Sequence, residues 1–403
     1  MIPIITSLLD TDLYKLKMSE FISQTEHSDT LVEFKFINRS NVDLGSILDL
    51  SRLEDEISNL MSLRFDYYDL SYLNEIGFSK EYLNILTKID DIACAVNILE
   101  GNLNIRVVGP WKYATLYETP ILAIVNELYG SIISNSLLPS SQMSAITEKL
   151  SRKVEELKKD KRIRFIEFGT RRRFSKFAQK VVMMSLQELC PTQMIGTSNV
   201  LLARDFDITP LGTLAHEVPM FYACISDSEE ELFNSQGKIL YKWISYCPNT
   251  YYIPDTYGTL NWLKQYAHII KKNESVGLRQ DSGNPITFID LVVETFEIES
   301  CPKLMFSDGL NIATMQEIMT YATNLGISSD KICFGWGTNL TNDGVIKPLS
   351  IVMKLNTVKL DYWRETVKLS DNIKKAIGRP LLAHYCKVFN YDNQPKYSMD
   401  CTY

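Results

Sequence analysis

The sequence predicts an α/β protein that combines a parallel sheet with a second, N-terminal α/β unit. Two observations lead to this prediction. The chain has 403 residues, more than the roughly 250–300 residues at which a single core usually stops growing. From about residue 160 onward, short apolar runs alternate with segments that could be helical. This alternation is typical of a parallel sheet.

The N-terminal part, residues 1–135, mixes helical and strand patterns without a regular rhythm. Residues 32–37 alternate like a half-buried strand, residues 47–63 have helical spacing, and residues 104–108 predict a short strand. The most apolar stretch, residues 120–138, is interrupted by polar residues and has helical spacing. It predicts a core helix and not a membrane span.

Eight apolar runs follow, each ending in Gly, Ser, Thr, Asp or Arg. They lie at residues 163–168, 194–195, 211–215, 251–253, 275–278, 303–306, 332–334 and 351–355. About eight such units, with polar residues just past each strand, favour a (β/α) barrel whose active site lies at the carboxyl ends of the strands. An open, doubly wound sheet gives a similar pattern and is the alternative.

The expected domain limits follow from these patterns. They are an N-terminal α/β domain (1–135), a barrel-like catalytic domain (136–345) and a C-terminal segment (346–403) that packs back on the N-terminal domain.

Composition narrows the class of protein. The net charge is -7, which does not favour general nucleic-acid binding, because that needs a basic face. The eight cysteines are scattered without a CxxC pair, as expected for reduced thiols in a cytoplasmic protein. The N-terminus lacks the basic region of a signal peptide. We therefore expect a cytoplasmic protein with neither nucleic-acid nor membrane partners.

His216 is the first candidate catalytic residue. It directly follows the apolar run 211–215, where a barrel strand would deliver it to the mouth. A lone histidine at a strand end is more often structural, but a neutral imidazole is also a competent nucleophile near neutral pH. Such a nucleophile needs a neighbouring acceptor to fix its proton, and Asp255 or Glu217 could serve.

An aromatic residue and an arginine follow the run 163–168. Phe168 offers a flat face on which an aromatic substrate could stack. Arg171 could meet an anion with its planar fork of donors. A basic surface turn is the alternative, since three consecutive arginines (171–173) cannot all face one way.

Arg279 and Asp281 lie two residues apart at the end of another predicted strand. Residues at this spacing face the same side of an extended chain, so both could line one pocket. Arg279 suits a carboxylate ligand, and Asp281 suits ribose hydroxyls or Mg²⁺. A structural ion pair is the alternative.

Two glycine-rich turns, residues 306–311 and 334–339, come late in the expected strand order. Glycines allow backbone N–H groups to converge on phosphate oxygens, and the last strands of a barrel often build a phosphate site. The turn at residues 196–199 is a weaker signal of the same kind. GxxxxGK[ST], GxGxxG, HExxH and GxSxG motifs are absent from the sequence.

Seven segments in order along the chain resemble those of nicotinate phosphoribosyltransferase in its bacterial form. They are residues 7–15, 167–175, 196–199, 212–217, 279–285, 307–311 and 337–343. The resemblance implies a type II phosphoribosyltransferase fold, an irregular α/β barrel with an N-terminal α/β domain that the C-terminal region completes. It also implies transfer of the 5-phosphoribosyl group from phosphoribosyl pyrophosphate to nicotinate in NAD biosynthesis, coupled to ATP hydrolysis.

The resemblance also implies roles for individual residues. His216 would be phosphorylated by ATP, Asp255 would orient it, and Asp281 would hold ribose or Mg²⁺. The residues that would hold nicotinate are Tyr14, Phe168, Thr213 and Arg279, with Arg279 meeting its charge. The residues that would address the phosphoribosyl and phosphate groups are Arg171, Ser307, Asp308, Gly309, Gly337 and Thr338. ATP and Mg²⁺ are thus the expected cofactors.

Three positions bear on substrate choice and on departures from the family. Ser198 stands where relatives that use nicotinamide have an Asp, and a carboxylate there would repel nicotinate. Trp336 replaces a smaller aliphatic residue and could narrow the phosphate turn. Asn284 replaces a common Asp, which leaves a metal role at this position open.

Other functions give different expectations. A sister enzyme could use nicotinamide or quinolinate. A sugar-phosphate-binding barrel without catalysis would keep the pocket but release no pyrophosphate, and a bare histidine phosphotransfer protein would need no pyridine pocket. The resemblance is compatible with a homodimer, because in this family the segment of Tyr14 can reach a neighbouring subunit.

Overall fold

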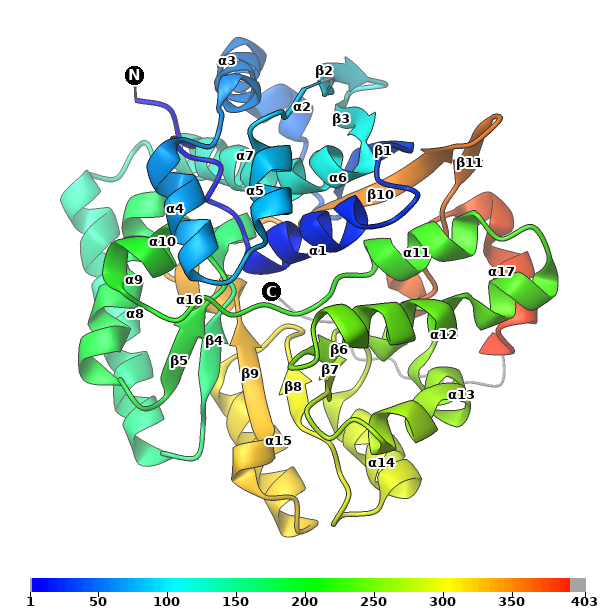
Figure 1. The fold of residues 1–403 in the computed structure, drawn as a ribbon. Helices are drawn as coiled ribbons and strands as arrows, with labels where there is room; N and C mark the ends of the chain where they lie inside the picture. The colour runs from blue at the N-terminus through cyan, green and yellow to red at the C-terminus, as the bar shows by residue number, and fades with distance from the viewer. Residues whose placement is uncertain (1, 91, 392–403) are drawn as a thin grey trace.

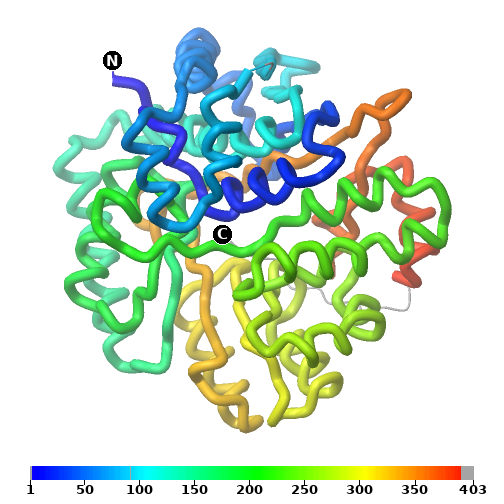
Figure 2. Tube along the Cα trace, in the orientation of Figure 1, coloured from blue at the N-terminus to red at the C-terminus, as the bar shows by residue number. Residues whose placement is uncertain are grey.

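An antiparallel sheet combines strands from the N-terminal and the C-terminal parts of the chain. The computed structural model describes residues 2–90 and 92–391. The strands of this sheet are β1 (Leu31–Asn38), β2 (Ala93–Leu99), β3 (Asn102–Pro110), β10 (Ile351–Lys359) and β11 (Trp363–Glu365). Their order is β11-β10-β1-β3-β2 (Figure 1). The strand β10 thus lies beside β1, although more than 300 residues separate them, and Figure 2 shows it running beside the N-terminal part of the chain.

A parallel sheet forms the second layer. Its strands are β4 (Phe165–Glu167), β5 (Met194–Thr197), β6 (Tyr251–Tyr252), β7 (Gly277–Gln280), β8 (Leu304–Phe306) and β9 (Ile332–Trp336). The order is β5-β4-β9-β8-β7-β6, and every neighbouring pair is parallel. Each strand overlaps one of the predicted apolar runs. The protein is therefore a mixed α/β structure, whereas closure of the parallel sheet into a barrel stays a prediction.

Two of the eight predicted barrel strands are wrong. Residues 351–355 belong to β10 and pair antiparallel with β1. Residues 211–215 form no strand but run extended, with the Leu211 amide donating to the Thr197 carbonyl. This segment passes so close to the start of the first helix that a Cβ on Gly212 would lie 2.9 Å from the backbone nitrogen of Tyr14. Packing close to that helix explains the apolar run, although an isolated parallel bridge from Pro210 to Thr197 links its start to β5.

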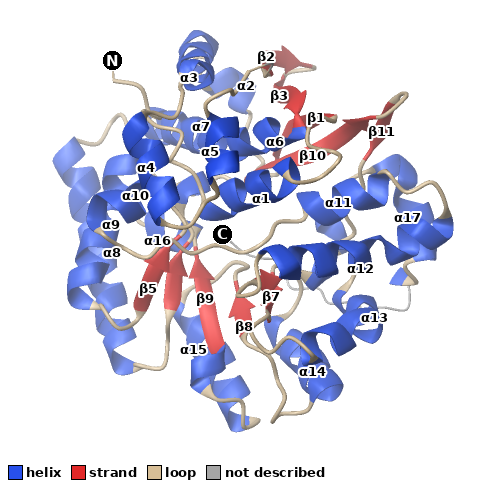
Figure 3. Ribbon diagram, in the orientation of Figure 1, coloured by secondary structure: helices blue, strands red, loops and turns tan. Residues whose placement is uncertain are grey.

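Helices cover the outer side of the parallel sheet (Figure 3). They are α8 (Pro139–Lys159), α9 (Lys176–Leu189), α13 (Thr259–Lys271), α14 (Pro285–Phe296) and α15 (Ile312–Asn324). They contact one another in the order α9, α8, α15, α14, α13, which follows the order of the strands inside. This layering is expected where each parallel strand is followed by a crossover helix.

The other helices pack around the antiparallel sheet and over the carboxyl ends of the parallel strands. They are α1 (Leu13–Ser23), α2 (Leu44–Ile47), α3 (Leu50–Ser62), α4 (Tyr67–Glu75), α5 (Lys80–Leu86), α6 (Trp111–Ala114), α7 (Glu118–Ile133), α10 (Val200–Phe206), α11 (Glu217–Cys224), α12 (Glu229–Tyr246), α16 (Thr338–Thr341) and α17 (Leu382–Val388). The predicted core helix at residues 120–138 is α7, which is largely buried. Within residues 2–90 and 92–391, no helix is long and apolar enough to span a bilayer.

Asparagine side chains begin three of the helices that follow parallel strands. Asn199, Asn284 and Asn311 each accept a hydrogen bond from a backbone amide in the first turn of α10, α14 and α15. Such N-caps stabilise a helix by about 1 kcal/mol each. They also fix the point at which the chain leaves the sheet, so the strand ends and helix starts converge on one edge. That edge carries the candidate site.

Candidate functional site

His216 lies directly before α11 and is almost fully buried, with 3% of its surface exposed. Its Nδ1 faces the interior, 3.0 Å from the Thr256 hydroxyl. Its Nε2 faces three charged groups: Lys368 Nζ at 2.8 Å, Asp281 Oδ2 at 3.1 Å and Asp255 Oδ1 at 3.6 Å. Burial and the nearby Lys368 ammonium lower the pKa of His216 to about 4. The imidazole is therefore neutral at physiological pH.

Of the two acceptors considered for His216, only Asp255 lies near the imidazole. The carboxylate of Glu217 points elsewhere, toward Lys15 and the indole N–H of Trp111. Asp255 lies in the 3₁₀ helix Pro254–Thr256, and its Oδ2 accepts a hydrogen bond from Ser282. Its Oδ1 is buried and has no hydrogen-bond partner among the described residues. The hydrogen-bond contact of Nδ1 is with the hydroxyl of Thr256, which is next in the chain to Asp255.

Arg279 and Asp281 form the predicted pair at the end of β7. The Arg279 guanidinium donates to Thr213 Oγ1, to Ser307 Oγ at 2.8 Å and to Asp281 Oδ1 at 2.6 Å. Burial raises the pKa of Asp281, but Arg279 and His216 outweigh it and hold this pKa well below its usual value. The Thr213 hydroxyl accepts a hydrogen bond from the guanidinium, so Thr213 helps to hold Arg279 in place.

A small pocket lies between α1 and the strand ends, and we call it the pyridine pocket after the ring that the sequence resemblance predicts for it. It is lined by Asp12, Tyr14, Glu118, Phe168, Arg171, Ser198, Ala215, His216, Ile253, Arg279, Asp281 and Lys354. Phe168 and Tyr14 supply aromatic rings, and the Arg279 guanidinium carbon lies 5.7 Å from the centroid of the Phe168 ring. The pocket has one flat apolar wall and a cationic side, which suits a planar, anionic ring.

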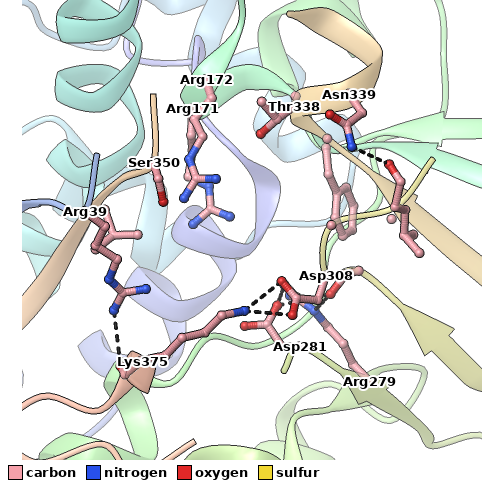
Figure 4. A pocket seen from close by; sticks show the side chains of 18 of the residues that line it. Arg39, Arg171, Arg172, Arg279, Asp281, Asp308, Thr338, Asn339, Ser350 and Lys375 are labelled. Carbon is pink, nitrogen blue, oxygen red and sulfur yellow. Dashed lines mark hydrogen bonds and ion pairs between the residues drawn. The ribbon is translucent and has the colours of Figure 1, made fainter. Parts of the chain in front are cut away.

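A second pocket, which we call the anion pocket, adjoins the first. Figure 4 shows side chains that line it. Its basic residues are Arg39, Arg171, Arg172, Arg279, Lys354, Lys368 and Lys375. The two predicted glycine turns line it through Ser307, Asp308, Gly309, Gly337 and Thr338. The pockets share Phe168, Arg171, Arg279, Asp281 and Lys354. A ligand can therefore extend from one pocket into the other.

The glycine at position 335 also makes room for the aromatic wall. A Cβ on Gly335 would lie 2.5 Å from the Phe168 ring. The neighbouring Trp336 is buried and packs edge-on against Phe165, with ring centroids 5.3 Å apart, so it is not part of the anion pocket lining. Asn284 caps α14, which gives its side chain a structural role.

Five basic residues of the anion pocket were missed by sequence reasoning, and one of them, Arg172, directly follows the predicted Arg171. Arg39 follows β1, Lys354 lies in β10, and Lys368 and Lys375 lie beyond β11. Lys375 pairs with Asp308 at 2.7 Å. Burial lowers the pKa of Lys354 to about 7, although Glu118 opposes this shift. A lysine within the apolar strand 351–355 was the one local signal in the sequence that could have pointed to Lys354.

The expected Mg²⁺ fits this site only in part. One ligand atom each from His216, Asp255 and Asp281 lies within 4.8 Å of the others. However, Mg²⁺ prefers an all-oxygen shell, and the Lys368 ammonium already contacts His216 while lying 3.8 Å from Asp255. Asp281 also accepts from Arg279 and Ser307. Substrate phosphates would thus have to supply most of the ligands of a magnesium ion.

Comparisons with known proteins agree along nearly the whole chain. A model described as the nicotinate phosphoribosyltransferase family matches residues 163–393, and one described as the N-terminal domain of this enzyme matches residues 9–126. The crystal structure of nicotinate phosphoribosyltransferase from Porphyromonas gingivalis is 29% identical, covers 96% of this chain and 100% of that chain, and gives a TM-score of 0.83. The enzyme from Vibrio cholerae is 29% identical, covers 99% of this chain and 95% of that chain, and also gives 0.83.

Proposed function

The chain belongs to the nicotinate phosphoribosyltransferase family, and from this premise we propose its reaction. It transfers the 5-phosphoribosyl group from phosphoribosyl pyrophosphate to nicotinate, giving nicotinate mononucleotide and pyrophosphate in NAD biosynthesis and salvage. The observation that carries this proposal is the junction of the two pockets. A pocket for a planar anion opens at Arg279 into a pocket lined by seven basic side chains.

The linings of the two pockets support a place for each substrate. Nicotinate stacks between Phe168 and Tyr14, with its carboxylate directed to Arg279. Phosphoribosyl pyrophosphate occupies the anion pocket, where the glycine turns and the arginines meet its phosphates. The anomeric carbon then lies at the junction, near Asp281. This carboxylate stabilises the positive charge that develops on the sugar in an oxocarbenium-like transition state. Mg²⁺, held by the phosphates, would neutralise the departing pyrophosphate.

ATP hydrolysis is coupled to this transfer through His216. The imidazole is neutral, as a nucleophile must be, and it lies at the edge of the pyridine pocket beside Asp281, which also lines the anion pocket. Attack on the terminal phosphorus of ATP would give a phosphohistidine. Its formation and hydrolysis would drive the transfer toward nicotinate mononucleotide.

Substitution of His216 tests the coupling. We expect His216→Ala to retain slow transfer from phosphoribosyl pyrophosphate but to lose ATPase activity and stimulation by ATP. His268→Ala is the matched control, because His268 is exposed on α13. Full ATP-stimulated turnover by His216→Ala would refute the assignment of the phosphoryl acceptor.

Turnover with nicotinate, nicotinamide and quinolinate, measured side by side, tests the proposed substrate. We expect nicotinate to be used with the highest kcat/KM. A preference for either of the other pyridines would overturn the substrate assignment but leave the phosphoribosyl transfer intact.

A further inference from the structure

Lys368 does not lie in a local sequence motif that predicts a functional role. It follows β11, and its side chain is 7% exposed. The ammonium reaches His216 Nε2 at 2.8 Å and Asp255 Oδ2 at 3.8 Å. The same side chain lines the anion pocket. Lys368 is thus a single cation shared between the imidazole and the phosphate site.

The two closest contacts of His216 Nε2 require opposite protonation states of this nitrogen. The Lys368 ammonium can only donate, so it requires a lone pair on Nε2. The Asp281 carboxylate, 3.1 Å away, is an acceptor and would require a proton on Nε2. Both demands cannot be met in one state. The Lys368 contact is shorter, and Asp281 already accepts from Arg279 and Ser307.

The contact of the other ring nitrogen, Nδ1, is compatible with either protonation state of Nε2. The partner of Nδ1 is the Thr256 hydroxyl at 3.0 Å, which can donate or accept. With a lone pair on Nε2, the proton of the neutral ring lies on Nδ1 and is donated to Thr256. Nε2 is the nitrogen that faces the pocket, so this tautomer is also the one that can attack a phosphoryl group.

We propose that Lys368 is a positioning residue that holds His216 in the tautomer with a lone pair on Nε2 and releases this lone pair when nucleotide phosphates enter the anion pocket. The inference rests on the phosphohistidine of the proposed function. In the free protein the ammonium covers Nε2. An entering triphosphate offers stronger acceptors on the side of the anion pocket, so the ammonium moves to them and exposes the nucleophile.

The phosphoryl transfer then balances without a proton acceptor. The Nε2 lone pair forms the N–P bond with the terminal phosphorus of ATP. The bond from this phosphorus to the bridging oxygen breaks, and its electron pair leaves on ADP. The ring keeps its Nδ1 proton and gains a positive charge. The buried Oδ1 of Asp255 has no hydrogen-bond partner in the described part of the chain and lies 3.6 Å from Nε2, where it stabilises that charge.

Rapid-quench labelling with γ-labelled ATP tests whether Lys368 affects the rate at which phosphohistidine forms. Lys368→Met keeps the apolar stem and removes the donor. We expect it to form phosphohistidine about 10- to 100-fold more slowly than wild type, because the lost contact involves a charged donor. Lys387→Ala is the control, because Lys387 is exposed on α17 in the same C-terminal region. Labelling of Lys368→Met at the wild-type rate overturns the proposal.

Chemical rescue separates a missing donor from a damaged fold. In Lys368→Ala, the space left by the side chain can admit a small primary amine. We expect methylammonium to restore labelling, and tetramethylammonium or sodium chloride at the same ionic strength to have no effect. Equal restoration by all three salts, or by none, contradicts a role as hydrogen-bond donor.

Nitrogen-15 NMR of the imidazoles shows which ring nitrogen is protonated and requires no catalytic turnover. The protein has four histidines, and His216→Ala identifies the signal of interest. We expect unprotonated Nε2 in the wild type and protonated Nε2 in Lys368→Met, where Asp281 becomes its partner. The same tautomer in both proteins overturns the inference. If γ-labelled ATP leaves no label on the wild type, the phosphohistidine of the proposed function is refuted instead. The NMR comparison still tests the role of Lys368, because it does not depend on labelling.

Discussion

Ser198 donates a hydrogen bond of 2.6 Å to Asp12, and this bond connects the end of β5 with the start of α1. The backbone adds a second link, since the Leu13 amide donates to the Ser198 carbonyl at 2.7 Å. Together these bonds hold α1 over the strand ends. Tyr14, one residue further along, therefore lines the pyridine pocket of its own chain.

An aspartate at position 198 is expected to impair binding of nicotinate. Burial already raises the pKa of Asp12 above its usual value, and a second carboxylate beside it would add negative charge to the pyridine pocket. We expect Ser198→Asp to raise the KM for nicotinate by at least about tenfold but to affect the KM for nicotinamide less. Ser198→Asn, similar in shape but neutral, is the control. Equal increases for both pyridines would contradict the charge argument.

A site completed by one chain should work without a partner. Because Tyr14 and Phe168 line the same pocket in a single chain, we expect specific activity to stay constant when the enzyme is diluted through any monomer–dimer equilibrium. The measurement is initial rate against enzyme concentration, with mass determined by light scattering at the same concentrations. A specific activity that falls together with dimer content would show that a neighbouring subunit supplies part of the site.

Removal of Arg279 should weaken nicotinate binding in particular. Charge-assisted hydrogen bonds of this kind contribute about 1.5–3 kcal/mol, so Arg279→Met should raise the KM for nicotinate roughly 10- to 150-fold. Arg162→Met is the control, because Arg162 is an exposed residue paired with Asp160. An unchanged KM would show that the carboxylate of nicotinate is bound elsewhere.

Binding of pyrophosphate should weaken at alkaline pH because of Lys354. Its pKa of about 7 means that the ammonium loses its charge as the pH rises above neutrality. A bound anion stabilises the charged form, so binding above pH 7 takes up a proton and the affinity falls by at most about tenfold per pH unit. Calorimetry in buffers of different ionisation enthalpy measures this uptake.

Lys354→Met supplies the control for that titration. We expect weaker binding with a flatter dependence on pH between 7 and 9. An equally steep dependence in the variant would assign the titration to another group, such as the pyrophosphate itself.

Much of the parallel sheet could be predicted, because each of its strands is an apolar run followed by residues that turn or cap. Asn199, Asn284 and Asn311 show why these motifs are visible in a sequence: each ends a loop and begins a helix. The run 211–215 failed as a strand because it passes close to α1 and is only partly buried, and packing against a helix produces the same apolar signal as packing in a sheet.

The candidate site was predictable where its residues stand in local motifs, as His216, Arg279 and Asp281 do. Arg39, Lys368 and Lys375 stand in no such motif. They reach the anion pocket only because β10 pairs with β1 and carries the C-terminal segment across the strand ends. Contacts of this kind depend on the tertiary fold and leave no periodic pattern in the sequence.

The proposed coupling requires that His216 accepts the terminal phosphoryl group of ATP. Incubation of the wild-type enzyme with γ-labelled ATP, followed by peptide mapping, detects this phosphoryl group on the protein. We predict an acid-labile, base-stable phosphate on the peptide that contains His216, and no such label in His216→Ala. ATP-stimulated synthesis of nicotinate mononucleotide without that label, or with the label on another residue, would show that His216 is not the phosphoryl acceptor.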